Sequence, residues 1–193
     1  MTSRFFAFLS RMKYIDRWGL MRCTTKENVA EHSLFTTWVA HALAVIENKY
    51  FGGTFDPYKI GMMAAYHETG EVITGDMPTP IKYFSPEIRT AYKKVEKVAE
   101  DRILSTLPDD LVDDFSVLVQ PTGEEKRLVK CADKLTAYIK CVEELAGGNN
   151  EFKKASESIY CELKSYESKS VDYFLDTFVE AYKLSLDELS VTD

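Results

Sequence analysis

The apolar residues of this chain recur at helical spacing, and no stretch alternates between apolar and polar residues long enough to predict a strand. The pattern predicts helices over residues 3–14, 24–47, 56–73, 85–106, 108–119, 123–146, 150–166 and 170–187. The sequence contains no internal repeat, low-complexity tract or domain linker. We therefore expect an all-α fold, with residues 1–193 forming one helical domain long enough to bury a core.

Local signals mark several of the expected helix boundaries. Thr24 and Glu27 have the spacing of a capping box, which predicts that the second helix begins there. Asp56 precedes Pro57, and proline is tolerated in the first turn of a helix. Two prolines within Gly75–Pro80 restrict their own backbone and that of the residues before them. This segment is therefore predicted to be a loop between helices.

Composition and charge exclude several classes of protein. The net charge of -7 does not favour general nucleic-acid binding, which requires a basic surface. No apolar run approaches the roughly 20 residues of a membrane span, and Arg11 and Lys13 interrupt the apolar residues near the N-terminus. The four cysteines form no CxxC pair and indicate free thiols in a reducing compartment. We therefore expect a cytoplasmic protein with no membrane or nucleic-acid partner.

Basic residues are concentrated in the first 30 residues, where only Asp16 and Glu27 are acidic. The basic positions are Arg4, Arg11, Lys13, Arg17, Arg22 and Lys26. Such a patch either faces a phosphate group or is an ordinary solvated surface. The sequence leaves both interpretations open.

The chain has three histidines, and two of them lie on one predicted helix. His32 and His41 are nine residues apart, which places them about 180° apart around a helix. They therefore cannot share a site. His41 lies one turn from Trp38 and Val45, so it is interpreted as a structural histidine.

Polar groups gather at the end of the next predicted helix. His67 and Glu71 continue an apolar stripe over Ile60–Ala64 at helical spacing, and Glu68 lies about 100° from His67. Buried carboxylates without a partner are unfavourable, so a shared cation explains their position. The alternative is a half-exposed helix end before a loop.

A further carboxylate lies far downstream on an apolar helix face. Asp133 has Val129, Ala132, Thr136 and Ala137 as its helical neighbours. A carboxylate in such a place is unusual unless it is paired or bound to a metal. Two imidazoles and two carboxylates would suit a divalent cation with open positions, which can make hydroxide available near neutral pH.

Longer motifs extend these observations into a resemblance to a known family. The chain resembles the HD-domain phosphohydrolase superfamily, and more closely the bacterial YfbR-like 5′-deoxynucleotidases. The resemblance runs almost end to end. The segments that carry it are Phe5–Ala7, Arg17–Trp18, Glu27–Leu34, Tyr66–Val72, Gly75–Phe84, Lys130–Asp133 and Glu143–Phe152. The Arg-Trp pair and the Gly75–Phe84 loop are far more specific than the metal signature alone.

The resemblance implies an HD-domain helical bundle that usually forms a homodimer. It also implies one divalent metal cation, such as Co, Mn, Mg or Zn. The implied metal ligands are His32, His67, Glu68 and Asp133. The implied catalytic residues are Glu71, which handles protons or orients water, and Arg17, which grips the phosphate. The implied substrate-binding residues are Arg17, Trp18, His32, Asp76, Met77, Pro78, Thr79 and Asp133.

Residue 68 departs from the pattern of the family, which is named for a His-Asp pair. Here the pair is His67-Glu68, and the extra methylene moves the carboxylate by roughly 1.5 Å. Metal–ligand distances tolerate only about ±0.2 Å. Glu68 therefore folds back, binds in bidentate fashion, or leaves the metal.

The leading hypothesis is metal-dependent hydrolysis of a (deoxy)nucleoside 5′-monophosphate. One alternative is a non-catalytic or weakly active nucleotide-binding protein that lost metal chemistry at Glu68. The others are a helical interaction module and a nucleoside triphosphohydrolase with the same metal core. The polar stripe at residues 67–71 together with Asp133 argues against the interaction module.

Overall fold

The computed structural model describes residues 2–82 and 84–190, so Tyr83 of the matched loop lies outside the described residues. These two stretches contain helices and no strand, and the expected all-α class is confirmed. The α-helices are α1 (Phe5–Leu9), α2 (Val29–Tyr50), α3 (Pro57–Tyr66), α4 (Glu71–Thr74), α5 (Thr79–Lys82), α6 (Pro86–Leu104), α7 (Val112–Val119), α8 (Gly123–Ala146), α9 (Lys153–Ser165), α10 (Lys169–Phe178) and α11 (Leu186–Leu189). Short 3-10 helices cover Ser10–Tyr14, Asp109–Leu111, Asn150–Phe152 and Val179–Lys183.

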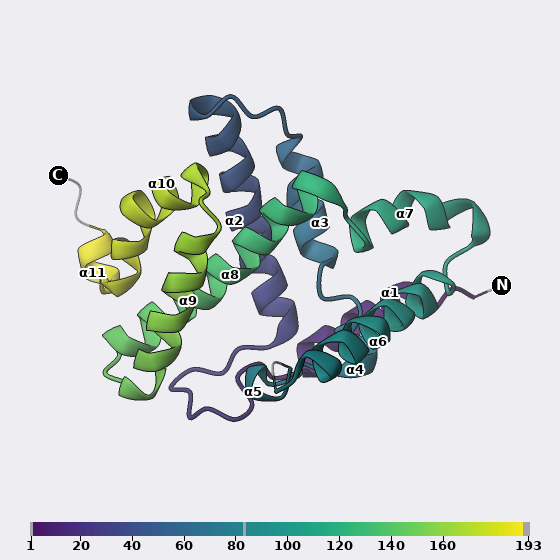
Figure 1. The fold of residues 1–193 in the computed structure, drawn as a ribbon, viewed down its shortest axis with the longest axis horizontal. Helices are drawn as coiled ribbons and strands as arrows, with labels where there is room; N and C mark the ends of the chain where they lie inside the picture. Colours follow the sequence, from purple (N-terminus) through teal and green to yellow (C-terminus); the bar gives the residue numbers. More distant parts are fainter. Residues whose placement is uncertain (1, 83, 191–193) are drawn as a thin grey trace.

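The core forms around α2, which packs against both α3 and α8 (Figure 1). Leu43 of α2, Ile60 of α3 and Leu135 of α8 are fully buried in one cluster. Burying such a side chain contributes roughly 1.5–3 kcal/mol. A second cluster around Phe5 and Ile103 joins α1 to α6 and α7. Because α2, α3 and α8 meet at the centre, polar groups on their facing sides are brought together from distant parts of the sequence.

α2 is the core helix, although its composition resembles that of a membrane span. Its most apolar stretch has a mean hydropathy of 1.2 over 18 residues, but half of that stretch is buried inside the fold. Packing against α3 and α8 accounts for this apolar character.

The start of α2 differs from the sequence prediction. The capping box is formed by Asn28 and Glu31, whose side chains and backbone amides bond reciprocally. The predicted box of Thr24 and Glu27 is wrong, because the amide and hydroxyl of Thr24 both donate to Glu144. A long-range contact therefore takes the donors that a local cap would have used.

The predicted helix over residues 56–73 is broken in two. Asp56 caps α3 and Pro57 occupies its first turn, as predicted. α3 then ends at Tyr66, and a tight turn leads to α4. In that turn the hydroxyl of Thr69 donates to the Tyr66 carbonyl at 2.6 Å, and the backbone amides of residues 67, 69 and 71 bond three residues back. These bonds tighten the turn and redirect the chain after His67.

Candidate metal centre

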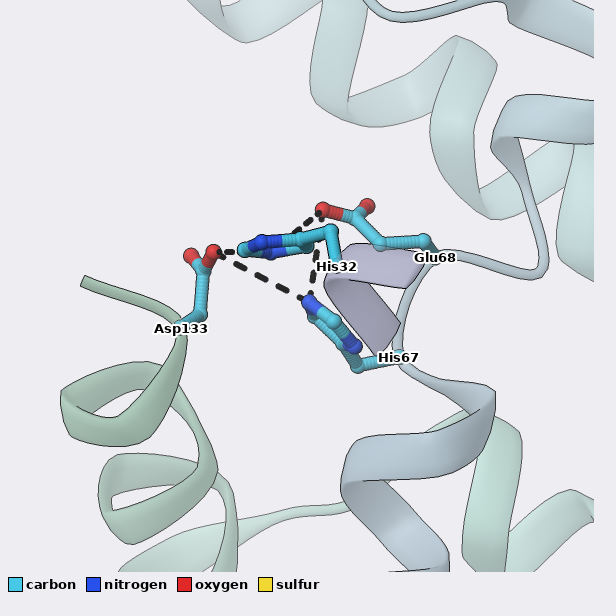
Figure 2. A group of neighbouring side chains, drawn as sticks. All are labelled: His32, His67, Glu68 and Asp133. Carbon is cyan, nitrogen blue, oxygen red and sulfur yellow. Dashed lines mark hydrogen bonds and ion pairs between the residues drawn. The ribbon is translucent and has the colours of Figure 1, made fainter. Parts of the chain in front are cut away.

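Four side chains that can bind a metal meet where α2, α8 and the turn after α3 approach one another (Figure 2). They are His32 on α2, His67 and Glu68 in the turn, and Asp133 on α8. One ligand atom of each lies within 4.8 Å of all the others. His32 Nε2 lies 3.0 Å from Asp133 Oδ1, and Glu68 Oε1 lies 3.3 Å from His67 Nε2. The fold thus brings together the four residues that the sequence had singled out.

His67 presents one defined nitrogen to this cluster. Its Nδ1 lies 2.6 Å from the carbonyl oxygen of Ala64, which can only accept, so Nδ1 carries the proton. Nε2 then faces Glu68 and Asp133, at 3.3 and 3.8 Å, and has no hydrogen-bond partner among the described residues. Acceptors that face one another in a buried place require a positive charge between them, so the donor set fits a divalent cation.

The pKa shifts within the cluster have the same electrostatic origin. Burial alone would lower the pKa of His67, but the carboxylates of Glu68 and Asp133 raise it to about 10. Burial also opposes ionisation of Glu68, yet His67 and Arg17 hold its pKa at about 2. Burial and the charge of Arg17 lower the pKa of His32, which leaves this ring neutral and able to bind a metal.

Arg17 is the residue of the N-terminal basic group that the fold turns inward. Its side chain is 11% exposed, with Nη1 3.4 Å from Glu68 Oε1 and Nε 3.3 Å from Glu27 Oε2. Burial opposes its charge, but the surrounding carboxylates raise the pKa of Arg17. The remaining basic residues of the group are exposed, namely Arg4, Arg11, Lys13, Arg22 and Lys26. The solvated-surface interpretation therefore fits these five, and a phosphate-facing role is left for Arg17.

Trp18 lies beside Arg17 in a strained conformation. Its φ of 59° is in the left-handed region, which costs a non-glycine residue roughly 1–3 kcal/mol. Its Nε1 donates to Glu27 Oε2 at 2.8 Å, and its ring lies 5.3 Å from the ring of Phe152. Such strain persists only when the surroundings hold the residue in place.

Glu27 is the site residue that sequence reasoning missed. The sequence suggested that it caps α2, whereas its carboxylate contacts both Arg17 and Trp18. Its position inside the matched segment Glu27–Leu34 was a signal, but the spacing from Thr24 favoured the local explanation. Only the folded chain shows which partners this carboxylate has.

Glu71, at the start of α4, is a buried carboxyl group beside the cluster. It is 7% exposed, and its Oε2 has no hydrogen-bond partner in the described part of the chain. Burial, together with the negative charges of Glu68 and Asp76, raises the pKa of Glu71 to about 9. In the metal-free protein this carboxyl group is therefore protonated near neutral pH.

The loop after α4 contributes one further charged group. Asp76 is half-buried, and burial raises its pKa while Arg17 opposes the shift. Met77 and Pro78 are also half-buried, whereas Thr79 is exposed at the start of α5. The described hydrogen bonds and ion pairs do not join these three residues to the metal-binding cluster. The structure thus places Asp76 in electrostatic range of Arg17.

His41 lies away from the cluster, as the helix geometry predicted. His32 is fully buried, whereas His41 is half-buried and its ring lies 5.6 Å from the ring of Tyr58. Its neighbours Trp38 and Val45 are exposed, so His41 packs at the surface and not in the core. The separation of the two histidines by helix face is confirmed.

Comparison with known proteins identifies the family of the chain. The model of the 5′-deoxynucleotidase YfbR-like family matches residues 4–182. The chain belongs to this family. It is 52% identical over 191 residues to a 5′-deoxynucleotidase of Vibrio cholerae, covering 97% of this chain and 98% of that protein. It is 49% identical over 191 residues to the 5′-deoxynucleotidase YfbR of Escherichia coli O1:K1, covering 97% of this chain and 96% of that protein.

Solved structures share the fold at lower sequence identity. An HD-domain phosphohydrolase from Listeria innocua superposes with a TM-score of 0.81 at 23% identity, covering 97% of this chain and 92% of that chain. A cyanophage S-2L HD phosphohydrolase, solved with dA and one catalytic Zn²⁺ ion, has a TM-score of 0.63 at 18% identity and covers 90% of this chain and 95% of that chain. The expected HD-domain fold is confirmed, and so is the resemblance drawn from the sequence.

Proposed function

We propose that this family member is a metal-dependent phosphohydrolase that releases phosphate from (deoxy)nucleoside 5′-monophosphates. The observation that carries the proposal is the cluster of four donor atoms within 4.8 Å, with the buried guanidinium of Arg17 beside it. Identities of 49–52% to curated 5′-deoxynucleotidases over 97% of the chain support the same activity. The protein is therefore assigned to the phosphoric monoester hydrolases.

His32, His67, Glu68 and Asp133 would hold one divalent cation such as Co, Mn, Mg or Zn. When bound, such a cation supplies Lewis acidity, polarising a phosphoryl oxygen and lowering the pKa of water. The position of Glu68 Oε1, 3.3 Å from His67 Nε2, supports a glutamate that folds back far enough to act as a ligand. The departure from the His-Asp pattern is then an adjusted site and not a lost one.

The substrate phosphate would lie against Arg17. A guanidinium group forms charge-assisted and often bidentate hydrogen bonds with phosphate oxygens, and its planar fork fixes their orientation. Arg17 lies 3.4 Å from Glu68, so a phosphate bound to it would also be next to the cation site. His32 and Asp133 would meet the phosphate on the other side of that site.

The nucleoside would extend from the phosphate towards Trp18 and the loop over residues 76–79. Trp18 can form a wall of the pocket through its ring. The carboxylate of Asp76 can accept a hydrogen bond from a sugar hydroxyl and would crowd a ribose with one more hydroxyl. Met77, Pro78 and Thr79 would complete the sugar pocket.

Glu71 would manage the proton of the reaction. A carboxyl group whose pKa is about 9 keeps its proton near neutral pH, here with Oε2 free of hydrogen bonds to the described residues. It can donate that proton to the leaving 5′-oxygen or orient the attacking water. Proton transfer of this kind typically contributes about 10²–10⁴-fold to the rate.

The protein would act in the cytoplasm as a homodimer, without nucleic-acid or membrane partners. The net charge of -7 supports the absence of a nucleic-acid partner. Exposed apolar residues on α2, including Leu34, Phe35 and Trp38, support association with a second copy. Light scattering coupled to size-exclusion chromatography would measure the mass of the protein in solution. A homodimer should have twice the mass of one chain, and a mass near 22.0 kDa would indicate a monomer.

The decisive experiment removes bound metal with a chelator and restores single metals before measuring phosphate release. The panel contains deoxynucleoside and ribonucleoside monophosphates together with a deoxynucleoside triphosphate. The proposal expects phosphate from the monophosphates only after metal is restored. Release of triphosphate from the deoxynucleoside triphosphate would instead identify a triphosphohydrolase. Nucleotide binding without release of any phosphate under every metal would identify a non-catalytic nucleotide-binding protein.

A further inference from the structure

The segment between the first 3-10 helix and α2 brings Arg17 and Trp18 to the site without regular secondary structure. Among the described residues, its only ladder contact is the bridge between Asp16 and Asn28. A segment of this kind depends on side-chain contacts for its shape. The contacts nearest the site converge on Glu27, whose side chain is 14% exposed.

We propose that Glu27 is a positioning residue that fixes Arg17 and Trp18 on the substrate side of the site and His32 on the metal side. The kinetic effects that we expect depend on the proposed function. The contacts of Glu27 follow from the geometry alone. Oε2 of this carboxylate contacts both Trp18 and Arg17, and Oε1 faces His32.

The first contact holds Trp18. Its Nε1 donates to Glu27 Oε2 at 2.8 Å, and the backbone amide of Arg17 donates to the Glu27 carbonyl at 2.9 Å. Phe152 packs against the indole, with 5.3 Å between the ring centroids. Because Trp18 has a φ of 59°, it would relax towards a common conformation if these restraints were removed. Glu27 supplies the polar restraint among them.

The second contact orients the guanidinium of Arg17. Glu27 Oε2 lies 3.3 Å from Nε, the nitrogen nearest the main chain, while Nη1 faces Glu68 of the cluster at 3.4 Å. Glu27 holds the Nε end by charge, without a hydrogen bond among the described residues, and Glu68 holds the Nη1 end through a hydrogen bond. Loss of the charge at residue 27 would leave Arg17 paired with Glu68 alone, so the guanidinium could turn away from a bound phosphate.

The third contact concerns the ring of His32. Its Nδ1 lies 3.8 Å from Glu27 Oε1, on the opposite side of the ring from Asp133, which Nε2 meets at 3.0 Å. That distance is too long for a hydrogen bond, and Nδ1 forms none with the described residues. When a cation takes the lone pair of Nε2, the ring proton must lie on Nδ1, where the negative charge of Glu27 stabilises it.

The test compares Glu27→Gln with wild type in three measurements. The chain has two tryptophans, so a Trp38→Phe background isolates the emission of Trp18. In that background we expect Glu27→Gln to raise acrylamide quenching of Trp18 at least twofold. With dAMP and saturating Mn²⁺, kcat/KM should fall at least tenfold, with most of the loss in KM. Titration of the metal-free proteins with Mn²⁺ should show that Glu27→Gln binds the ion about tenfold more weakly than wild type. This is the lower end of the loss usually seen when a residue that supports a metal ligand is changed.

A double-substitution cycle separates positioning from a general loss of stability. If Glu27 acts partly through Arg17, the Arg17→Ala and Glu27→Gln changes together should reduce kcat/KM by clearly less than the product of their separate effects. Glu31→Gln is the matched control, because it removes a capping carboxylate of the same helix that is exposed and has no contact with Arg17. It should lower the melting temperature and leave kcat/KM within twofold of wild type. Glu27→Asp keeps the charge and should recover part of the lost activity, and it carries the test if the glutamine variant does not fold.

Two results would overturn the proposal. One is a folded Glu27→Gln protein with unchanged Trp18 quenching and kcat/KM within twofold of wild type. The other is full additivity of the Arg17→Ala and Glu27→Gln effects. If wild type proved inactive on every nucleotide, the proposed function would fail, but quenching and metal binding would still decide whether Glu27 positions these groups.

Discussion

The buried carboxyl group of Glu71 makes a quantitative prediction about stability. Burial and its acidic neighbours raise the pKa of Glu71 from its ordinary value of 4.5 to about 9. Between these values the native protein keeps a proton that the unfolded chain has released. The stabilisation connected with that proton is complete below pH 4.5 and is lost as the pH rises towards 9. Glu71→Gln carries no ionisable group, so it should escape this loss.

The size of the effect follows from the linkage between proton binding and folding. Each pH unit inside the window is worth about 1.4 kcal/mol. The stability of Glu71→Gln relative to wild type should therefore grow by about 3 kcal/mol between pH 6 and pH 8. For a chain of this length, that corresponds to roughly 5–10 °C in melting temperature. A residue proposed to act in catalysis would thus reduce the stability of the resting protein.

The assay is urea unfolding of metal-free wild type and Glu71→Gln at pH 6, 7 and 8, followed by far-UV circular dichroism at constant ionic strength. Glu157→Gln, at an exposed position on α9, controls for the change from carboxylate to amide. Its stability should run parallel to that of wild type. If Glu71→Gln also ran parallel to wild type, Glu71 would be ionised in the native state and could not hold the reaction proton near neutral pH.

Three further predictions concern the metal and phosphate groups. Arg17→Ala should lower kcat/KM by an amount equivalent to about 1.5–3 kcal/mol of transition-state stabilisation, and elemental analysis should find the metal content unchanged. If the variant lost metal together with activity, the separate phosphate role of Arg17 would be contradicted. His32→Ala should abolish metal binding, whereas His41→Ala should chiefly lower the melting temperature; metal loss from the His41 variant alone would contradict the assignment by helix face. Glu68→Asp should weaken metal binding at least tenfold in a direct titration, because the shorter side chain falls roughly 1.5 Å short. An aspartate variant more active than wild type would indicate a decayed site.

Local sequence signals were sufficient to predict the positions of most of the helices. α3, α6 and α8 begin within a residue or two of the predicted positions, because caps, prolines and apolar period act over one or two turns. The same local geometry was sufficient to separate His32 from His41. The prediction failed at the turn after α3, where the Thr69 hydroxyl and the three-residue backbone bonds compete with the helix. The periodic pattern of apolar residues contains no information about which hydrogen bonds the turn will form.

The metal-binding residues could be listed from the sequence, but their geometry could not. Residue types and the family motifs identified His32, His67, Glu68 and Asp133. The reach of the longer Glu68 side chain depends on the turn after α3, which directs its Oε1 to within 3.3 Å of His67 Nε2. A difference of one methylene group can only be judged once the backbone that carries it is placed.

Tertiary structure alone decided the partners of the buried charges. Glu27 and Thr24 are three residues apart and suggested a cap, yet one contacts Arg17 and Trp18 while the other donates to Glu144, 120 residues away. The sequence by itself determined the helices and the residue types of the site, because these follow from local spacing and chemistry. The pairing of each charge depended on how α2 and α8 pack, because a buried carboxylate binds whichever donors the fold places within a few ångströms.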